Sequence, residues 1–265
     1  MKVGVRIVVA TARGARIAAP RLAEVLRRHA ATATFYFNLG PDRLHRWLPG
    51  RRVTARTAAA MLSVRDQGFE VGLHGWDCMR WRDRVPRPDF GWTEDAMRCA
   101  CRAFERLFGD APRTHAAPGW QMNRHAFRLT QRLGFDYSID TRGQAAFIPV
   151  VEAEIVACPQ LPTTLPTLAE LIGRDGTLPT TQGTELAAAP RSGRVLTLLA
   201  ERDGTHHLAA FERLLEGWRA LDYQIVSLRE LAQDLDAKSL AHHVVDTEPM
   251  PGIGNIATQG AVFLA

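Results

Sequence analysis

Residues Phe69 to Trp81 read FEVGLHGWDCMRW, and the rest of the chain can be interpreted outward from them. The apolar run Phe69 to Leu73 predicts a short strand, which delivers His74 to the turn that follows it. Cys78 comes four residues later, and both neutral imidazole and thiolate are good zinc ligands. By itself the pair is more typical of a buried thiol beside a hydrogen-bonded histidine, so the remaining sequence must decide.

Strands and helices alternate along the whole chain. The continuous apolar run Lys2 to Val9 is typical of a strand buried on both faces of a parallel sheet. The other predicted strands are Thr34–Phe37, Phe69–Leu73, Thr114–Ala117, Phe135–Ile139, a short one around Glu154–Ala157, Arg194–Leu199 and Tyr223–Ser227. This order predicts an α/β fold, a deformed barrel of six or seven βα units whose site lies at the carboxyl ends of the strands. We expect a single barrel domain over residues 1–237 and an irregular tail over 238–265, where Gly and Pro recur.

Composition narrows the classes of protein that fit. The net charge of +5 comes from arginine, because Lys2 and Lys238 are the only lysines among 265 residues. The basic run Arg43 to Arg56 has no interleaved aromatic residue apart from Trp47, which argues against a nucleic-acid partner. No apolar run reaches the length of a membrane span and the N-terminus has no signal-peptide pattern, so we expect a cytoplasmic protein. Four cysteines in no paired pattern fit free thiols in a reducing compartment.

Short motifs spread over most of the chain point to a family. They are VGVRI at residues 3–7, RG at 13–14, GPD at 40–42, VGLH at 71–74, WD at 76–77, GW at 119–120, LPT at 165–167 and IGRD at 172–175. With them the chain resembles the polysaccharide deacetylases, and among these the deformylases that act on formamido-arabinose carried by undecaprenyl phosphate in lipid A modification. The resemblance implies a deformed (β/α) barrel of the polysaccharide deacetylase type. It also implies a zinc-type ion held by one Asp and two His, which assists amide hydrolysis.

The resemblance also shows where this chain departs from the family. The two carboxylates at the end of the first strand correspond to Val8 and Ala10, and Ala10 stands at the third metal-ligand position. The second metal histidine corresponds to Cys78, so His74 is the one metal ligand kept unchanged. The arginine that orients the base corresponds to Gln121, and the acid histidine to Leu199. We therefore expect zinc or a similar divalent ion to bind weakly here or not at all.

Other positions of the family site are retained. Asp140 and Glu201 are predicted as surviving carboxylates beside the reacting groups, with donors such as Arg142 around Asp140. The predicted substrate-binding residues are Arg13, Trp76, Trp120 and Arg142.

Three functions follow as hypotheses. The first is a barrel of the deformylase type that has lost its chemistry, a pseudoenzyme. The second is an active metal-dependent hydrolase with a rearranged site built from His74, Cys78, Asp140 and Glu201, with Asp203, His206, His207 and His115 as further candidate ligands. The third is a non-catalytic binder of a lipid-linked amino-sugar phosphate, with at most peripheral membrane contact, using Arg6, Arg13, Arg142 and Arg174.

Overall fold

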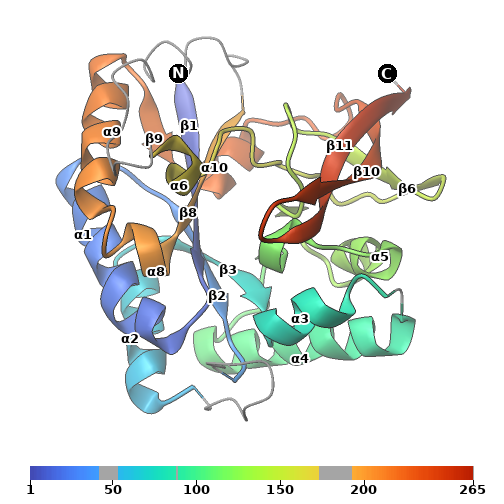
Figure 1. Cartoon of the computed structure of the whole chain (residues 1–265), viewed down its shortest axis with the longest axis horizontal. Helices are drawn as coiled ribbons and strands as arrows, with labels where there is room; N and C mark the ends of the chain where they lie inside the picture. The colour runs from blue at the N-terminus through green and yellow to red at the C-terminus, as the bar shows by residue number, and fades with distance from the viewer. Residues whose placement is uncertain (42–52, 88, 173–192, 265) are drawn as a thin grey trace.

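A curled, wholly parallel sheet forms the centre of the protein, as the alternation of elements predicts (Figure 1). The computed structural model describes residues 1–41, 53–87, 89–172 and 193–264. Strand order is β5-β4-β3-β2-β1-β8, and β9 also pairs with β1. The bounds are β1 Lys2–Val9, β2 Thr34–Asn38, β3 Glu70–Gly75, β4 Thr114–His115, β5 Tyr137–Ser138, β8 Arg194–Leu199 and β9 Gln224–Val226. The predicted deformed barrel is therefore confirmed in an open form.

An extended segment spans the opening between the edge strands β5 and β8. Leu161 N donates to Ser138 O at 2.8 Å on one side, and Leu165 N donates to Val195 O at 3.1 Å on the other. Prolines 159, 162 and 166 flank these donors, and proline keeps a chain extended without needing a partner for its own nitrogen. The segment therefore completes the wall of the barrel.

Helices cover the outside of the sheet, and α10 lies across its amino-terminal end, where its Leu228 and Leu231 leave no room for a Cβ at Gly4. The helical bounds are η1 Gly14–Ala18, α1 Ala19–Arg28, α2 Ala55–Asp66, α3 Cys78–Arg84, α4 Phe90–Phe108, η2 Pro118–Trp120, α5 Arg124–Arg132, α6 Leu168–Leu171, α8 Ala200–Asp203, α9 Leu208–Ala220 and α10 Leu228–Gln233. None of the helices described here combines the length and the apolar character needed to cross a bilayer.

Strand β1 divides the core into two parts. Val5, Ile7 and Val9 point toward the helices and join the large cluster between sheet and helices. Because side chains alternate along a strand, Arg6 and Val8 point the other way, into the barrel. Inside the barrel, a smaller apolar cluster that includes Tyr36, Tyr137 and Val195 fills the half nearer to α10. The other half, toward the carboxyl ends of the strands from Arg6, contains a cavity.

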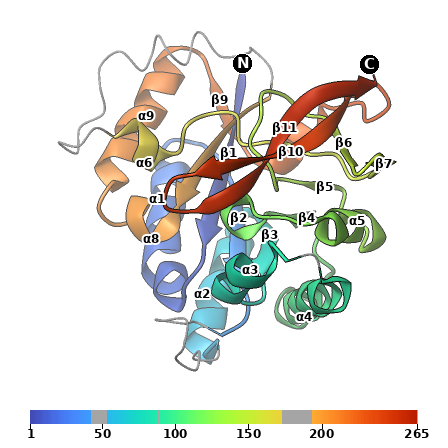
Figure 2. The ribbon, with the colours of Figure 1, turned by 45° about the vertical axis from the view of Figure 1, so that its right-hand side comes forward.

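The C-terminal segment is not the irregular tail that the sequence predicts. Strands β10 (His242–Met250) and β11 (Gly254–Leu264) form an antiparallel hairpin, and β10 pairs in parallel with β6 (Ile148–Val151), which in turn pairs with β7 (Glu154–Ile155). Pro251 and Gly252 lie in the tight turn at the hairpin tip, where Gly252 has φ 76°. This hairpin, drawn in red, belongs to a second sheet beside the barrel (Figure 2).

Candidate functional site

A cavity of about 900 Å³ opens at the carboxyl ends of the parallel strands. Its size lies within the usual range for a small-molecule site, and its position is the one at which barrels of this kind build their sites. The walls come from the ends of β1, β3 and β8, from the turn around η2, from α6 and from the hairpin tip. They include Arg6, Val8, Ala10, His74, Cys78, Arg82, Trp120, Arg142, Glu170, Thr197, Leu199, Met250, Ile253, Ile256 and Thr258.

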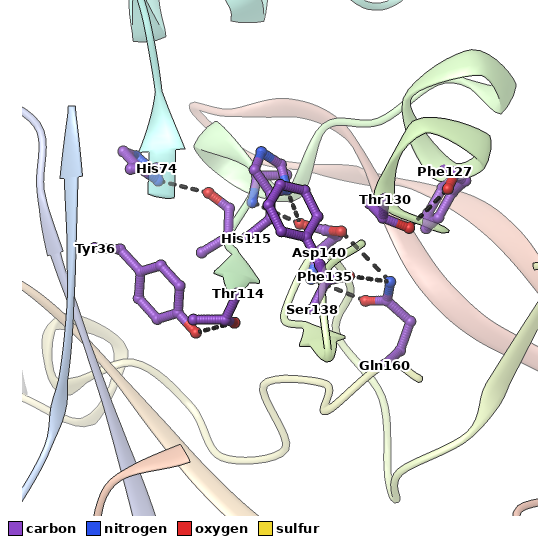
Figure 3. Close-up of polar contacts among 12 residues, drawn as sticks. Tyr36, His74, Thr114, His115, Phe127, Thr130, Phe135, Ser138, Asp140 and Gln160 are labelled. Atoms are coloured by element: carbon purple, nitrogen blue, oxygen red, sulfur yellow. Dashed lines mark hydrogen bonds and ion pairs between the residues drawn. The ribbon is translucent and has the colours of Figure 1, made fainter. Parts of the chain in front are cut away.

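His74 is held in one orientation at the end of β3. Its Nδ1 lies 2.7 Å from the carbonyl oxygen of Ala116, so Nδ1 carries the proton and donates it (Figure 3). Burial, reinforced by the charge of Arg6, lowers the pKa of His74 to about 3, and the ring is therefore neutral at physiological pH. A neutral imidazole with one nitrogen fixed by a carbonyl is the arrangement of a metal-ligating histidine.

The residues around His74 nevertheless do not fit a zinc ion. Cys78 lines the same cavity, but burial, followed by the nearby charges of Asp77 and Glu201, raises the pKa of its thiol well above the ordinary value. Zinc binds the thiolate, which this environment disfavours. Within the described ranges, no three His, Cys, Asp or Glu side chains come together in a way that could hold a metal ion. Catalytic zinc takes three protein ligands, and Ala10 offers no side-chain donor.

The positions that the family resemblance assigns to base and acid lie at the cavity as apolar groups. Val8 and Leu199 both line it, and they are neighbours because β1 and β8 pair in this register. Gln121 is buried just behind the wall, where its Nε2 donates to Ile253 O at 3.1 Å. Gln121 thus holds the hairpin tip. Its side-chain oxygen has no hydrogen-bond partner among the described residues.

Asp140 has partners other than the predicted Arg142. The carboxylate is fully buried, and its Oδ1 lies 2.7 Å from His115 Nδ1 and 2.8 Å from Ala117 N, both donors (Figure 3). Gln160 Nε2 donates to the second oxygen at 3.4 Å. The His115 ring stacks on Phe135 behind the site. Asp140 therefore supports the turn that presents Trp120, and it does not line the cavity.

Glu201 is also engaged in backbone support. Its Oε1 accepts from Ala10 N, Thr11 N and Thr11 Oγ1 at 2.8–2.9 Å, which ties α8 to the turn after β1. The further candidate Asp203 accepts from Leu199 N at 2.7 Å and lies 3.0 Å from His207 Nδ1. Neither carboxylate lines the cavity, so the rearranged hydrolytic site suggested by the sequence is not assembled by the described residues.

Two of the predicted substrate-binding residues do lie at the cavity, and they contact each other. The Arg142 guanidinium stands 5.4 Å from the centroid of the Trp120 ring and forms a two-point ion pair with Glu170 at 2.9 and 3.2 Å. Trp120 has φ 53°, a left-handed conformation that costs a non-glycine residue about 1 kcal/mol or more. Such strain is typical of positions that present a side chain to a ligand.

The other two predicted substrate-binding residues, Arg13 and Trp76, do not line the cavity. Arg13 is exposed at the start of η1, away from the cavity. Trp76 lines a separate hollow of about 160 Å³ with Trp81 and Trp92. Its backbone packs on the turn after β2 so closely that a Cβ at Gly40 would lie 1.9 Å from Trp76 O. Arg174 lies outside the described residues.

The sequence did not reveal the hairpin tip as part of the site. Met250, Ile253, Ile256 and Thr258 all line the cavity. The signal was present, because Pro251–Gly252 lies between runs rich in β-branched residues, which is a turn between strands. The contact of β10 with β6, about one hundred residues earlier in the chain, cannot be read from that local signal.

Comparisons with known proteins agree with this architecture. The sequence profile of the polysaccharide deacetylase family matches residues 13–138. A probable 4-deoxy-4-formamido-L-arabinose-phosphoundecaprenol deformylase of Shewanella sediminis is 28% identical over 98% of this chain and 92% of its own length.

Two solved structures show how widely the fold is used. A probable polysaccharide deacetylase from Pseudomonas aeruginosa PAO1 matches with TM-score 0.65 at 16% identity, covering 88% of this chain and 89% of its own. A pseudoenzyme of the CE4 family from Bacillus anthracis matches with TM-score 0.58 at 15% identity, covering 92% of this chain and 69% of its own. Because similar folds are found in a deacetylase and in a pseudoenzyme, the fold by itself does not decide whether a chain catalyses.

Proposed function

Because the chain is similar to the polysaccharide deacetylases in sequence and in fold, we propose that its barrel binds a lipid-linked amino-sugar phosphate without hydrolysing it. The proposed ligand is of the same class as the substrate after which the Shewanella sediminis relative is named. We propose that the protein acts in the context of lipid A modification. In this proposal the protein is cytoplasmic and touches the inner membrane at most peripherally. The observation that supports this proposal is a cavity lined by several arginines and by the apolar side chains Val8 and Leu199.

The binding half of the proposal rests on Trp120 and the arginines around it. Trp120 is 4% exposed and its ring holds the guanidinium groups of Arg6 and Arg142 at 5.1 and 5.4 Å from its centroid, and guanidinium groups pair with phosphate oxygens at two points. Arg82 and Arg202 are exposed and line the same cavity. A phosphate carried by a lipid at a membrane surface would meet this positive rim first.

The lack of hydrolysis follows from the reacting end. A general acid or base contributes roughly 10²–10⁴-fold to a rate, and an ion that polarises the carbonyl contributes several kcal/mol more. Val8 and Leu199 can exchange no proton, and the described residues present no three-ligand metal group. The losses fall on one catalytic unit and are not additive, yet together they leave binding as the main activity.

The experiment compares binding and turnover with the same ligand. A short-chain analogue of formamido-arabinose phosphoprenol is titrated calorimetrically at low and high salt, and formate release is followed with added zinc or cobalt. We expect binding that weakens with salt, and formate release no faster than in buffer. Metal-dependent formate release that disappears in His74→Ala would establish the active hydrolase in place of this proposal.

A matched pair of variants tests the binding site itself. Trp120→Ala is expected to weaken binding about tenfold or more, because the ring that positions the Arg6 and Arg142 guanidinium groups at the cavity is lost. Trp92→Ala removes an indole that does not line the cavity and should bind the analogue as the unmodified chain does. Equal affinities for all three proteins would refute the assignment of the cavity.

A further inference from the structure

Arg6 is a buried cation at the floor of the cavity. Its side chain projects from the middle of β1 into the barrel, and the residue is 1% exposed. Nη2 donates to Ala117 O at 3.2 Å and Nη1 to Thr163 Oγ1 at 3.5 Å. A guanidinium has five N–H donors, and the Nε donor is buried with no partner among the described residues. Such a group is costly to bury and calls for an acceptor.

No described carboxylate forms an ion pair with Arg6. The negative charge of Asp140 acts on Arg6 only from a distance, and the Asp140 oxygens already accept hydrogen bonds from His115, Ala117 N and Gln160. Glu170 is bound to Arg142. On the strand itself, the next inward-facing positions above Arg6 are Val8 and Ala10, about 6.6 and 13 Å along β1 at 3.3 Å per residue. The guanidinium lies 5.1 Å from the centroid of the Trp120 ring, a contact that brings no negative charge, so among the described residues the positive charge has no counter-ion at the cavity.

Hydroxyl groups around Arg6 are arranged as donors toward the same space. Thr163 Oγ1 accepts from Trp120 Nε1 at 3.0 Å and from Arg6 Nη1, so its own proton goes to Thr197 Oγ1, 2.9 Å away. The Thr197 hydroxyl, which lines the cavity, is thereby left to donate to a ligand. Across the cavity, Thr258 Oγ1 is buried and without a partner among the described residues.

We infer that the floor of the cavity is a small-oxyanion site, in which the Arg6 guanidinium and the Thr197 hydroxyl hold a carboxylate or phosphate group. This inference rests on the proposed function in taking the cavity to be a ligand site, and it names the chemical group that the floor selects. An oxyanion supplies the missing acceptor for Arg6 and the negative charge that Val8 and Ala10 do not. The cavity is much larger than the anion, which would be the inner end of a larger ligand.

The probes are sodium formate and methyl phosphate, added against sodium chloride at constant ionic strength, with binding followed by calorimetry and by the thermal midpoint. We expect at least one of them to bind in preference to chloride, and the tighter one identifies the group. Val8→Asp places a carboxylate two residues from Arg6 on the same face of β1 and should weaken binding roughly ten- to hundredfold, because the site is then internally neutralised. Arg6→Gln should do the same if it folds.

Arg98→Gln is the matched control, since it removes one positive charge from an exposed site on α4. Anion binding that Arg98→Gln reduces as much as Val8→Asp, or that Val8→Asp leaves unchanged, overturns the inference, as does the absence of any preference over chloride. The failure modes are separate. If formate binds with Arg6 dependence and the sugar-phosphate analogue does not bind, the proposed larger ligand falls and the oxyanion site stands. If the analogue binds equally well to Val8→Asp, the reverse holds.

Discussion

Glu70 at the amino-terminal end of the barrel and Arg6 below the cavity at the other end are both buried charged side chains, but their polar atoms are satisfied to different degrees. At the amino-terminal end, Glu70 accepts from Thr34 Oγ1 at 2.5 Å, Tyr137 OH at 2.9 Å and Arg229 N at 2.9 Å, and it lies 3.3 Å from Arg229 Nε. At the carboxyl end, Arg6 has two long hydrogen bonds and a cation–π contact with the Trp120 ring at 5.1 Å, but its buried Nε has no partner among the described residues and it forms no ion pair with any of them. One buried charge is fully satisfied and the other is open toward a cavity.

The difference separates folding from binding. A buried charge whose oxygens are all bound supports the fold, whereas an incompletely bound one costs stability until a ligand completes it. Burial lowers the pKa of Arg6 to about 10, so the guanidinium keeps its charge at neutral pH and cannot avoid this cost by losing a proton. The predictions below test this contrast at both ends of the barrel.

The largest effect is expected for Glu70→Ala. Removing the carboxylate leaves Thr34, Tyr137 and the Arg229 amide without their acceptor at a buried site, and hydrogen bonds to a charged group are worth about 1.5–3 kcal/mol each. We expect the free energy of unfolding, measured in urea, to fall by about 3 kcal/mol or more. Glu94→Ala is the control, because Glu94 pairs with Arg98 on the exposed face of α4 and should change stability by less than about 0.5 kcal/mol.

Arg6→Met should act with the opposite sign. A methionine side chain of similar length fills the space without a desolvated charge, and replacing poorly compensated buried charges by apolar groups is often neutral or stabilising. The unfolding free energy of the ligand-free protein should stay unchanged or rise by about 1 kcal/mol. A loss of several kcal/mol would show that the two long hydrogen bonds of Arg6 stabilise the fold, and the contrast between the two ends would disappear.

The sequence predicts the scaffold well because the relevant signals are local. Apolar strands such as Lys2–Val9 alternate with helices, and their carboxyl ends bring Ala10, His74 and Leu199 to one cavity as expected for parallel strands. The partners of individual side chains are less predictable. Asp140 binds His115, 25 residues away, where a charge-based expectation favours Arg142.

The C-terminal hairpin could not be predicted from local sequence patterns either. Its strands are polar and half-exposed, so they lack the apolar pattern that identifies β1. Their pairing partner β6 is set by the tertiary fold. The same holds for segment 160–165, whose role in spanning the edge between β5 and β8 depends on where those strands end.

At the amino-terminal end, the cap of α10 gives a pH-dependent effect of moderate size. Burial raises the pKa of Glu230, but hydrogen bonds from Thr32 and from the Ser227 amide and hydroxyl outweigh it and lower the pKa below its ordinary value. A lowered carboxylate pKa stabilises the fold above the unfolded-state value near 4.3, and this contribution is lost as pH falls through the folded-state pKa.

Glu230→Gln should therefore cost about 1 kcal/mol at pH 7, and the difference from the unmodified protein should shrink as the solution is made more acidic than pH 4. Unfolding in urea at a series of pH values measures it. Glu216→Gln, exposed on α9, is the control and should show no such trend. A difference that grows toward acid pH would show that the charged form of Glu230 does not stabilise the folded state.

The smallest effect is expected at the carboxyl end, where Arg82 holds the hairpin tip over the cavity. Its Nη2 donates to Ile253 O at 3.2 Å and to Gly252 O at 3.5 Å, and both bonds are exposed. Arg82→Ala should lower the global free energy of unfolding by less than about 0.5 kcal/mol, but local opening of the tip should become several-fold more frequent. Hydrogen exchange of the Ile253 amide, which donates to Met250 O, reports that opening. Arg84→Ala removes a neighbouring exposed arginine that stacks on Trp92 instead and should leave this exchange unchanged. If formate protects the Ile253 amide in the unmodified chain and not in Val8→Asp, occupancy of the Arg6 floor is coupled to the tip above it, and the open charge at this end of the barrel is a ligand site and not a defect of packing.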